Sequence, residues 1–400
     1  MIDVHVDGII FAEQPRGGIS RMWANILRRL PDQGCRVHLY LPQAATQRLE
    51  LPDTIDIVKY PRKQELRPGR LFRRFCDARF RAAVNRMWAR PVSGVYHSTH
   101  FTTYPSLRIP QIVTVHDLFH ERLPDCFEER ERGQFTARRK LCVEQATRLV
   151  ADSDATVKDM TLVYKCAASA VRTIPLAVEP AFRKINDEGA LQRIRNLLAQ
   201  GHPYILFVGT RYTYKNFSAL LAAYALWPHR ANYRLVAVGP SVSCQESAQV
   251  RAYKLDDLVH FRSSLSDEDL VAAYNAAAAT VVPSLSEGYG FPVCEAMACG
   301  TPVVAARAGS LPEVGKSTAV YFDHGSPALL TAAIDEAVRI DRDGERIREG
   351  IRTAIARTWD DVAREYAAVY QEVQARDGRS APGVFGSPGI GPLVNTDAVA

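Results

Sequence analysis

The sequence predicts an α/β protein with two doubly wound parallel sheets, and two observations lead to this fold class. Short apolar stretches alternate with amphipathic stretches along the chain, which is typical of parallel strands joined by helices that cover both faces of a sheet. The pattern restarts after "PLAVEPAFRKI", near residues 175–185, where two prolines favour a connection between domains. Because 47% of the 400 residues are hydrophobic, each half can bury its own core.

The first half supplies the elements of an N-terminal domain over residues 1–180. Residues 2–6 are expected to form a strand, the loop "AEQPRGGIS" follows, and a helix is expected from about Arg21 to Arg29. Further short apolar strands are predicted in "CRVHLYLP", "GVYHSTH", "QIVTVHD" and "RLVADS".

The second half repeats this pattern over residues 181–358. The expected strands "PYILFVGT", "YRLVAVGP", "LVHFRSS", "ATVVPSL" and "TPVVAAR" alternate with helical stretches such as "NFSALLAAYALW". The stretch "WDDVAREYAAVYQEVQAR", residues 359–376, predicts a final amphipathic helix. Residues 377–400 are rich in Gly and Pro and lack periodicity, which predicts a disordered tail.

Composition and charge exclude several classes of protein. The formal net charge of +6 is modest for this length, which argues against binding of nucleic acid but allows anionic ligands. The eight cysteines include no C-x-x-C pair, so neither structural zinc nor a disulfide framework is expected, and a reducing cytoplasm fits best. The N-terminus does not resemble a signal peptide, and no apolar stretch reaches the roughly 20 residues that span a bilayer.

Two carboxylates flank a glycine turn in "SEGYGFPVCEAMACGTPVV", residues 286–304. Glu287 follows an expected strand and Glu295 lies within the first turns of a helix, for which Pro292 suits a first helical position. Ligands of doubly wound sheets bind at the carboxyl ends of the strands. Both acids are therefore expected to face a ligand, where each is suited to hold the hydroxyls of a sugar.

Two cations stand on a strand-to-helix loop in "FVGTRYTYKNF". Gly209 ends the expected strand, Arg211 and Lys215 follow, and a helix begins near Asn216. Such cations beside a helix N-terminus favour a diphosphate, although a surface loop with solvated cations would look the same. A third candidate, His116, ends the apolar strand of "TVHDLF", where a histidine is either structural or part of the site.

These motifs, in this order, resemble the retaining, nucleotide-sugar-dependent glycosyltransferases of family 4, which have the GT-B fold. The most specific element is the spaced glutamate pair, and the supporting elements are "PRGGISR", "TVHDLF", "VADSDATVKDM", "IPLAVEP", "VGTRYTYKNF" and "GSLPEV". The resemblance covers residues 1–376. It implies two Rossmann-like domains that face a central cleft, with the final helix packing back on the N-terminal domain.

The resemblance also implies a role for each site residue. Glu287 and His116 are similar to the residues near the transferred sugar, and Glu295 is similar to the glutamate that holds the ribose hydroxyls. Arg211 and Lys215 look like the basic pair on the donor diphosphate. In the family, several turns approach the donor, and the residues of this chain that match them are Gly17, Gly18, Gly209, Gly290, Phe291 and Pro292.

The resemblance implies no cofactor, and we expect no required metal. Three D-x-D triplets, in "ADSDAT", "SDEDL" and "DRDGE", are similar to the metal–diphosphate motif of a different glycosyltransferase architecture. Asp152 and Ser153 of the first triplet are interpreted as helix-capping residues, the second triplet also opens a helix, and the third lies in a loop. Cations of the protein are expected to take the place of the metal.

The expected substrates are a nucleotide-diphosphate sugar and a glycan or polyprenyl-diphosphate-linked acceptor. GDP-mannose is the first choice, because "VGTRYTYKNF" and "EGYGFPVCEAMACGTPV" look most like mannosyltransferases of bacterial surface polysaccharides; UDP-sugars stay open. Residues 60–90 interleave Arg with aromatic residues. This indicates either a peripheral contact with the anionic inner face of a membrane or a solvated basic helix.

Other functions compete with glycosyl transfer. A sugar-nucleotide epimerase shares this two-domain architecture, and an inactive glycan- or nucleotide-binding paralogue would keep the fold. The intact Glu287, Glu295 and Lys215 argue against the inactive paralogue. A nicotinamide oxidoreductase is disfavoured because no G-x-G-x-x-G follows the first strand.

Overall fold

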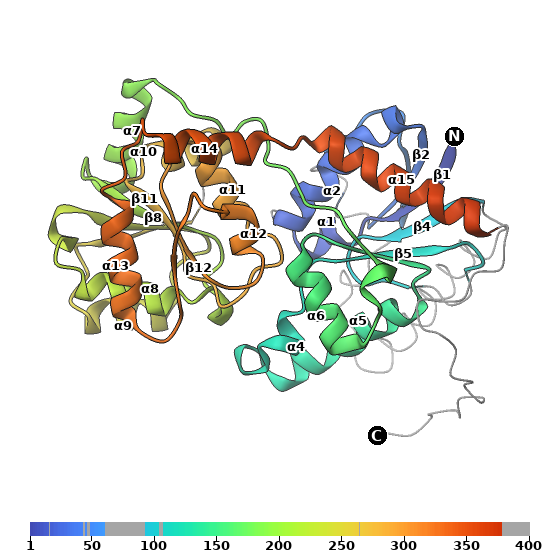
Figure 1. Cartoon of the computed structure of the whole chain (residues 1–400), viewed down its shortest axis with the longest axis horizontal. Coiled ribbons are helices and arrows are strands. Elements are labelled where there is room, and N and C mark those ends of the chain that lie inside the picture. The colour runs from blue at the N-terminus through green and yellow to red at the C-terminus, as the bar shows by residue number, and fades with distance from the viewer. Residues whose placement is uncertain are drawn as a thin grey trace.

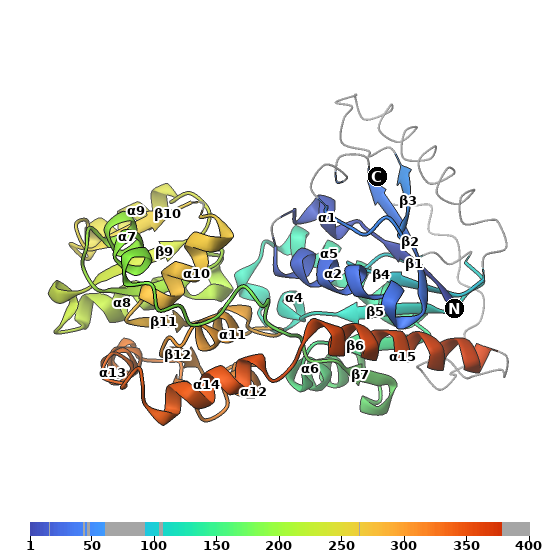
Figure 2. The same cartoon turned by 90° about the horizontal axis from the view of Figure 1, so that it is seen from above.

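The computed structural model describes residues 1–15, 17–42, 45, 49–60, 93–103, 107–263 and 265–377. Two lobes lie side by side, each built on one parallel sheet between layers of helices (Figure 1, Figure 2). This confirms the predicted pair of doubly wound domains. The basic segment 60–90 and the tail 377–400, apart from their first residues, lie outside the described residues. None of the described helices is long and apolar enough to cross a membrane.

The N-terminal sheet has the strand order β3-β2-β1-β4-β5-β6-β7, and all neighbouring strands are parallel. The order reverses between β1 and β4, which is where ligands of such sheets bind. The strands are β1 (Ile2–Asp7), β2 (Cys35–Pro42), β3 (Asp56–Tyr60), β4 (Val95–Ser98), β5 (Gln111–Val115), β6 (Arg148–Ala151) and β7 (Val171–Thr173). The helices are α1 (Ile10–Glu13), α2 (Gly18–Arg29), α4 (Phe119–Arg122), α5 (Glu129–Gln145) and α6 (Asp154–Tyr164).

The C-terminal sheet has the order β10-β9-β8-β11-β12-β13, again all parallel, and reverses between β8 and β11. Its strands are β8 (Tyr204–Val208), β9 (Arg234–Val238), β10 (Val259–Arg262), β11 (Ala279–Val282), β12 (Val303–Ala306) and β13 (Val320–Phe322). Its helices are α7 (Glu188–Ala199), α8 (Phe217–Leu226), α9 (Cys244–Ala252), α10 (Asp267–Ala276), α11 (Phe291–Ala298), α12 (Leu311–Gly315), α13 (Pro327–Ala337) and α14 (Glu345–Ile355).

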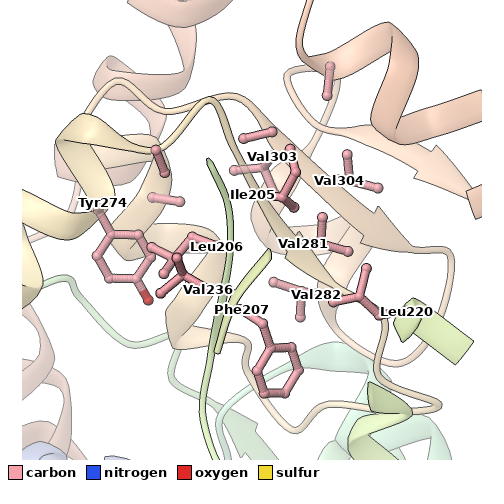
Figure 3. Packing of buried hydrophobic residues seen from close by; sticks show 14 of the residues in the cluster. Ile205, Leu206, Phe207, Leu220, Val236, Tyr274, Val281, Val282, Val303 and Val304 are labelled. Atoms are coloured by element: carbon pink, nitrogen blue, oxygen red, sulfur yellow. The ribbon is translucent and has the colours of Figure 1, made fainter. Parts of the chain in front are cut away.

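The core of the C-terminal domain explains why its strands are continuous apolar runs in the sequence. Side chains of β8, β9, β11 and β12 pack with residues of α8 and α10 (Figure 3). Successive residues of these central strands point to opposite faces of the sheet, and both faces are covered. Each strand therefore buries side chains on both faces, as Val281 and Val282 do on β11.

The last helix, α15 (Trp359–Asp377), leaves the C-terminal domain and lies along the N-terminal lobe (Figure 2). Its buried face, which includes Trp359 and Val362, joins the N-terminal core. Two tyrosines of this helix form hydrogen bonds inside that core. The hydroxyl of Tyr370 lies 2.8 Å from Nδ1 of His97, and the hydroxyl of Tyr366 lies 3.2 Å from Oγ1 of Thr114. This helix ties the two domains together.

The carboxyl ends of the two sheets meet at the boundary between the domains. Gly288, which follows β11, packs so closely on His116, which follows β5, that a Cβ on Gly288 would lie 1.9 Å from the His116 carbonyl oxygen. Nearby, the Glu313 carboxylate of α12 accepts hydrogen bonds from the backbone N–H groups of Asp154 (3.0 Å) and Ala155 (2.7 Å) at the start of α6. The carboxyl ends of β5 and β6 thus meet those of β11 and β12 in one region.

Candidate active site

Lys215 and Glu287 form an ion pair at the carboxyl edge of the C-terminal sheet. Lys215 ends the short 3-10 turn Thr213–Lys215 after β8, and its Nζ lies 2.7 and 2.8 Å from the two carboxylate oxygens of Glu287. The Ser284 hydroxyl donates to Oε1 of the same carboxylate at 2.6 Å. Glu287 is buried, and a buried carboxylate needs such partners to remain ionised. The predicted acid and cation are therefore brought together.

The turn that carries Glu287 is hydrogen-bonded to residues of "GSLPEV". Ser310 donates to the Glu287 carbonyl from its N–H (3.2 Å) and its hydroxyl (3.0 Å), and the hydroxyl also reaches the Tyr289 carbonyl at 2.7 Å. Gly309 has φ +52°, and a Cβ there would lie 2.6 Å from the Glu287 carbonyl oxygen. A side chain at this position would displace the turn.

The start of α11 is a tight turn in which the Val293 N–H donates to the Gly290 carbonyl at 3.0 Å and Pro292 has no N–H. Gly290 caps the helix with φ +102°, in the left-handed region that favours glycine. Phe291 is the first helical residue, so Pro292 stands at the second position and not at the predicted first; proline is tolerated in both, since the first N–H groups of a helix have no intrahelical acceptor. The turn and the helix N-terminus together suit an anion.

Glu295 is buried on α11 and bound from both domains. Its Oε2 accepts a hydrogen bond from the Tyr274 hydroxyl (2.8 Å), and its Oε1 lies 2.6 Å from Nη2 of Arg21 on α2 of the N-terminal domain. Burial and the adjacent Glu295 carboxylate raise the pKa of the Tyr274 hydroxyl, so Tyr274 remains a donor. Tyr274 carries no site signal in the sequence, and Arg21 ends the motif "PRGGISR" without any sign that it pairs with Glu295.

The glycine loop of the N-terminal domain meets the start of α11. Gly17 is the N-cap of α2 and Gly18 is its first residue, three residues before the predicted start of the helix. A Cβ on Gly18 would lie 3.1 Å from Cδ2 of Phe291. Gly18 thus lies beside the start of α11, and Gly17 packs on Gln14 of its own loop.

His116 is bound to Asp152 in the N-terminal half of the site. Its Nδ1 lies 2.7 Å from Oδ2 of Asp152, and both side chains are buried. Burial lowers the pKa of His116, but the Asp152 carboxylate outweighs it and the pKa is raised. Only part of the capping interpretation of "ADSD" is correct: the Ser153 hydroxyl caps α6 by accepting from the Thr156 N–H at 3.1 Å, whereas Asp152 holds the histidine.

Arg211 does not join Lys215 at Glu287 in this structure. Its guanidinium pairs with Glu246 of α9 and donates to the carbonyls of Pro240 (2.6 Å) and Ser241 (3.0 Å). Glu246 in turn completes a capping box at the start of α9. Gly209, with φ +138°, is close-packed on the next loop, since a Cβ on Gly239 would lie 2.1 Å from its carbonyl oxygen. Arg211 and Gly209 therefore shape the loop that presents Lys215.

The D-x-D triplets hold no metal-binding arrangement within the described residues, where no group of three or more His, Cys, Asp or Glu side chains could hold an ion. Ser266 caps α10 by accepting from the Asp269 N–H at 3.1 Å. Asp343 lies in a loop and pairs with Lys184 at 2.8 Å. Independence from metal stays a prediction.

Comparison with known proteins matches two family models to separate parts of the chain. The model of "Glycosyltransferase Family 4" matches residues 16–182, and that of "Glycosyl transferases group 1" matches residues 190–354. The chain is 29% identical over 391 residues to D-inositol 3-phosphate glycosyltransferase of Acidothermus cellulolyticus, covering 90% of this chain and 86% of the relative. It is 27% identical over 256 residues to O-antigen chain mannosyltransferase B of Escherichia coli, covering 62% of this chain and 66% of that one.

Solved structures share the fold at lower identity. Sucrose-phosphate synthase from Thermosynechococcus elongatus has a TM-score of 0.75 at 20% identity, with 94% of this chain and 100% of that chain covered. WaaG, a glycosyltransferase involved in lipopolysaccharide biosynthesis, has a TM-score of 0.64 at 19% identity, with 94% and 98% covered.

The two doubly wound domains and the solved structures define the GT-B fold, and the two family models identify the chain as a glycosyltransferase. The two family models together span most of the chain and divide it as the two sheets do. The chain belongs to family 4 of the glycosyltransferases.

Proposed function

We propose that this enzyme is a retaining hexosyltransferase that moves a sugar, with mannose from GDP-mannose as first choice, to a hydroxyl of a glycan or lipid-linked glycan. The observation that carries the proposal is the Lys215 ammonium, held at 2.7 and 2.8 Å on the Glu287 carboxylate. A fixed cation beside a carboxylate suits a reaction in which a diphosphate leaves a sugar.

In the proposed reaction, the bond between the anomeric carbon and the diphosphate oxygen breaks and its electron pair leaves with the diphosphate. The acceptor hydroxyl forms the new bond on the same face of the sugar and passes its proton to the leaving phosphate. Lys215 and the N-terminus of α11 stabilise the charge that develops on the leaving group. No protein group needs to act as a nucleophile.

The remaining roles follow from position. Glu287 holds hydroxyls of the transferred sugar and orients Lys215, and Glu295 holds the ribose. Asp152 raises the pKa of His116, which adds positive charge on the N-terminal side of the site when it is protonated. Arg211 acts on the donor through the Lys215 loop, because Glu246 engages its guanidinium.

The choice of donor and acceptor rests on relatives. Two of them are named as mannosyltransferases, MMP alpha-(1->4)-mannosyltransferase and O-antigen chain mannosyltransferase B. Another is D-inositol 3-phosphate glycosyltransferase, and solved structures of the same fold hold UDP or UDP-glucose. We place the mannosyl donor first and a UDP-sugar second. The cytoplasm and the inner face of a membrane are the proposed locations.

A panel of nucleotide sugars tests the proposal. GDP-mannose is expected to raise the melting temperature of the purified chain more than UDP-glucose or UDP-galactose does. With an acceptor glycan, the anomeric configuration of the product, read by NMR, is expected to match that of the donor. Appearance of an epimeric nucleotide sugar without acceptor would instead favour the epimerase, and an inverted product would end the retaining mechanism.

A further inference from the structure

Arg21 is a cation of the N-terminal domain whose partner belongs to the other domain. Its Nη2 lies 2.6 Å from Oε1 of Glu295, and its guanidinium lies 5.8 and 5.9 Å from the ring centres of Phe291 and Phe182. The Glu295 carboxylate raises the pKa of Arg21 above its usual value against the effect of burial, and Glu179 adds to this. Arg21 is thus held at the domain boundary by charge and by two aromatic rings.

This contact competes with the role proposed for Glu295. A carboxylate that binds ribose must accept hydrogen bonds from the 2′- and 3′-hydroxyls, but in this structure Oε1 faces Arg21 and Oε2 faces Tyr274. The Glu295 side chain is only 3% exposed, and that of Arg21 is 35% exposed. Tyr274 is fully buried. Arg21 is therefore the partner on the open side, and ribose reaches Glu295 only when Arg21 moves.

Arg211 does not join Lys215 as a second cation for the proposed diphosphate in this structure. Arg211, the predicted partner of Lys215, is engaged by Glu246 and two carbonyls. Arg21 lies over the ring of Phe291, the first residue of α11, and one turn after Gly18, which packs on the same ring. It therefore stands next to the helix N-terminus where the donor phosphates are proposed to bind.

We propose that Arg21 is a donor-binding residue supplied by the N-terminal domain: its guanidinium neutralises Glu295 in the free enzyme and passes to the donor diphosphate when the ribose hydroxyls take that carboxylate. The exchange keeps every charged group hydrogen-bonded, since Glu295 gains two hydroxyl donors and Arg21 gains phosphate oxygens. This inference rests on the proposed function of the site.

Calorimetric titration of the parent and Arg21→Gln with a nucleoside diphosphate and with its nucleoside tests the exchange. GDP and guanosine are used, or UDP and uridine if UDP is the diphosphate that binds the parent. The diphosphate is expected to bind Arg21→Gln about ten- to a hundredfold more weakly, as expected for the loss of a charged hydrogen bond. The nucleoside is expected to bind no more weakly, because its ribose no longer displaces a guanidinium.

Each other outcome overturns the inference. Equal weakening of both ligands would make Arg21 structural, tighter binding of both would make it only a competitor, and unchanged binding would remove it from the site. Arg29→Gln is the matched control: Arg29 lies on the same helix and pairs with Asp360 at 3.1 Å, and its loss is expected to leave both affinities unchanged.

A second variant covers the case in which Arg21→Gln does not fold, and the parent serves as a control for the site itself. If Arg21→Gln does not fold, Arg21→Lys retains the charge and is expected to bind the diphosphate less tightly than the parent, with the nucleoside unaffected; loss of both would again overturn the inference. If the parent binds neither diphosphate, the proposed function itself fails. If it binds and transfers sugar while Arg21→Gln binds like the parent, only the role of Arg21 fails.

Discussion

At the scale of single residues, the contacts of Lys215 and Glu287 would allow Lys215 to turn from Glu287 to a donor phosphate. The ammonium has three N–H donors and places its Nζ within 2.8 Å of both oxygens of one carboxylate. Ser284 also donates to that carboxylate, so Glu287 keeps a partner when Lys215 turns part of its hydrogen bonding to a phosphate. Lysine suits this exchange because its charge is compact and its donors rotate.

Lys215→Ala is expected to lower turnover far more than it raises the Michaelis constant for the donor. Negative charge grows on the leaving phosphate as the sugar departs, so the ammonium interacts more strongly with the transition state than with the bound donor. The expected loss in turnover is about a hundredfold, measured by steady-state kinetics with donor varied. Lys184→Ala, which removes a surface lysine paired with Asp343, is the control. Normal turnover with only a raised Michaelis constant would disprove the leaving-group role.

The His116–Asp152 pair predicts a pH dependence of stability with a definite sign. The folded pKa of His116 is raised, so the pair contributes its full stability below the unfolded value of about 6.5 and loses it as pH rises through the folded pKa. The melting temperature of the parent should therefore exceed that of Asp152→Asn most at low pH, and the gap should narrow as pH rises. A gap that stays constant from about pH 5.5 to about pH 9 would contradict this.

At the scale of elements, the fold was predictable because the physical signals are local. Parallel strands covered on both faces are continuous apolar runs, and β8 and β11 are recognisable for that reason. Glycine turns after these strands mark the positions where a ligand approaches. The final helix was equally clear from its apolar face, although its target, the N-terminal core, was known only from the family resemblance.

Tyr370 tests how much α15 contributes to the N-terminal core. Tyr370→Ala is expected to cost about 3–5 kcal/mol of unfolding free energy, because a large ring is removed from a buried site. Tyr370→Phe keeps the ring and loses only the hydrogen bond to His97, at about 1 kcal/mol. Urea denaturation of both variants measures the difference. Similar losses for Ala and Phe would show that the ring itself packs weakly.

The partners within the site were not predictable from sequence, since they depend on long-range pairing. Arg21 and Glu295 are 274 residues apart in the sequence. Glu246 of α9, which engages Arg211, is 35 residues from it. Spacing shows that Arg211 and Lys215 share a loop, but it does not show which carboxylate each will meet. The sequence pairs Arg211 with Lys215 because they share one loop. In the folded site the ion pairs join separate segments, as Arg21 with Glu295 and Lys215 with Glu287 do.

At the scale of the whole molecule, the two domains approach each other closely at several points, and at Gly288 there is no room for another atom. The Gly288 Cα faces the His116 carbonyl, Gly18 faces Phe291, and Glu313 binds the start of α6. The pairing of Glu295 with Arg21 adds a charge contact across the same boundary. Since the residues proposed for the donor come from both sides, transfer and full binding of the diphosphate should require this close approach, whereas binding of the nucleoside to the C-terminal domain need not.

Gly288→Ala tests that requirement directly. The added Cβ would lie 1.9 Å from the His116 carbonyl oxygen and 3.3 Å from Cβ of Asp117, so the domains cannot approach as they do in this structure. Each sheet and its core are untouched, and the variant is expected to fold with a melting temperature close to that of the parent. Turnover should fall by about a hundredfold or more, as a displacement on the order of 1 Å at a reacting centre can cause. The affinity for the nucleoside diphosphate should also weaken, because Arg21 of the N-terminal domain no longer reaches it, while the affinity for the nucleoside changes little.

Small-angle X-ray scattering and donor kinetics on Gly288→Ala would distinguish the causes. The radius of gyration with nucleotide sugar bound is expected to exceed that of the parent, since closure is blocked. Gly133→Ala is the control, because a Cβ at Gly133 on α5 meets nothing within 4 Å. Parent-like turnover in Gly288→Ala would mean that the productive arrangement is more open than this one, and the roles proposed for His116 and Arg21, which depend on the close approach, would then have to be withdrawn.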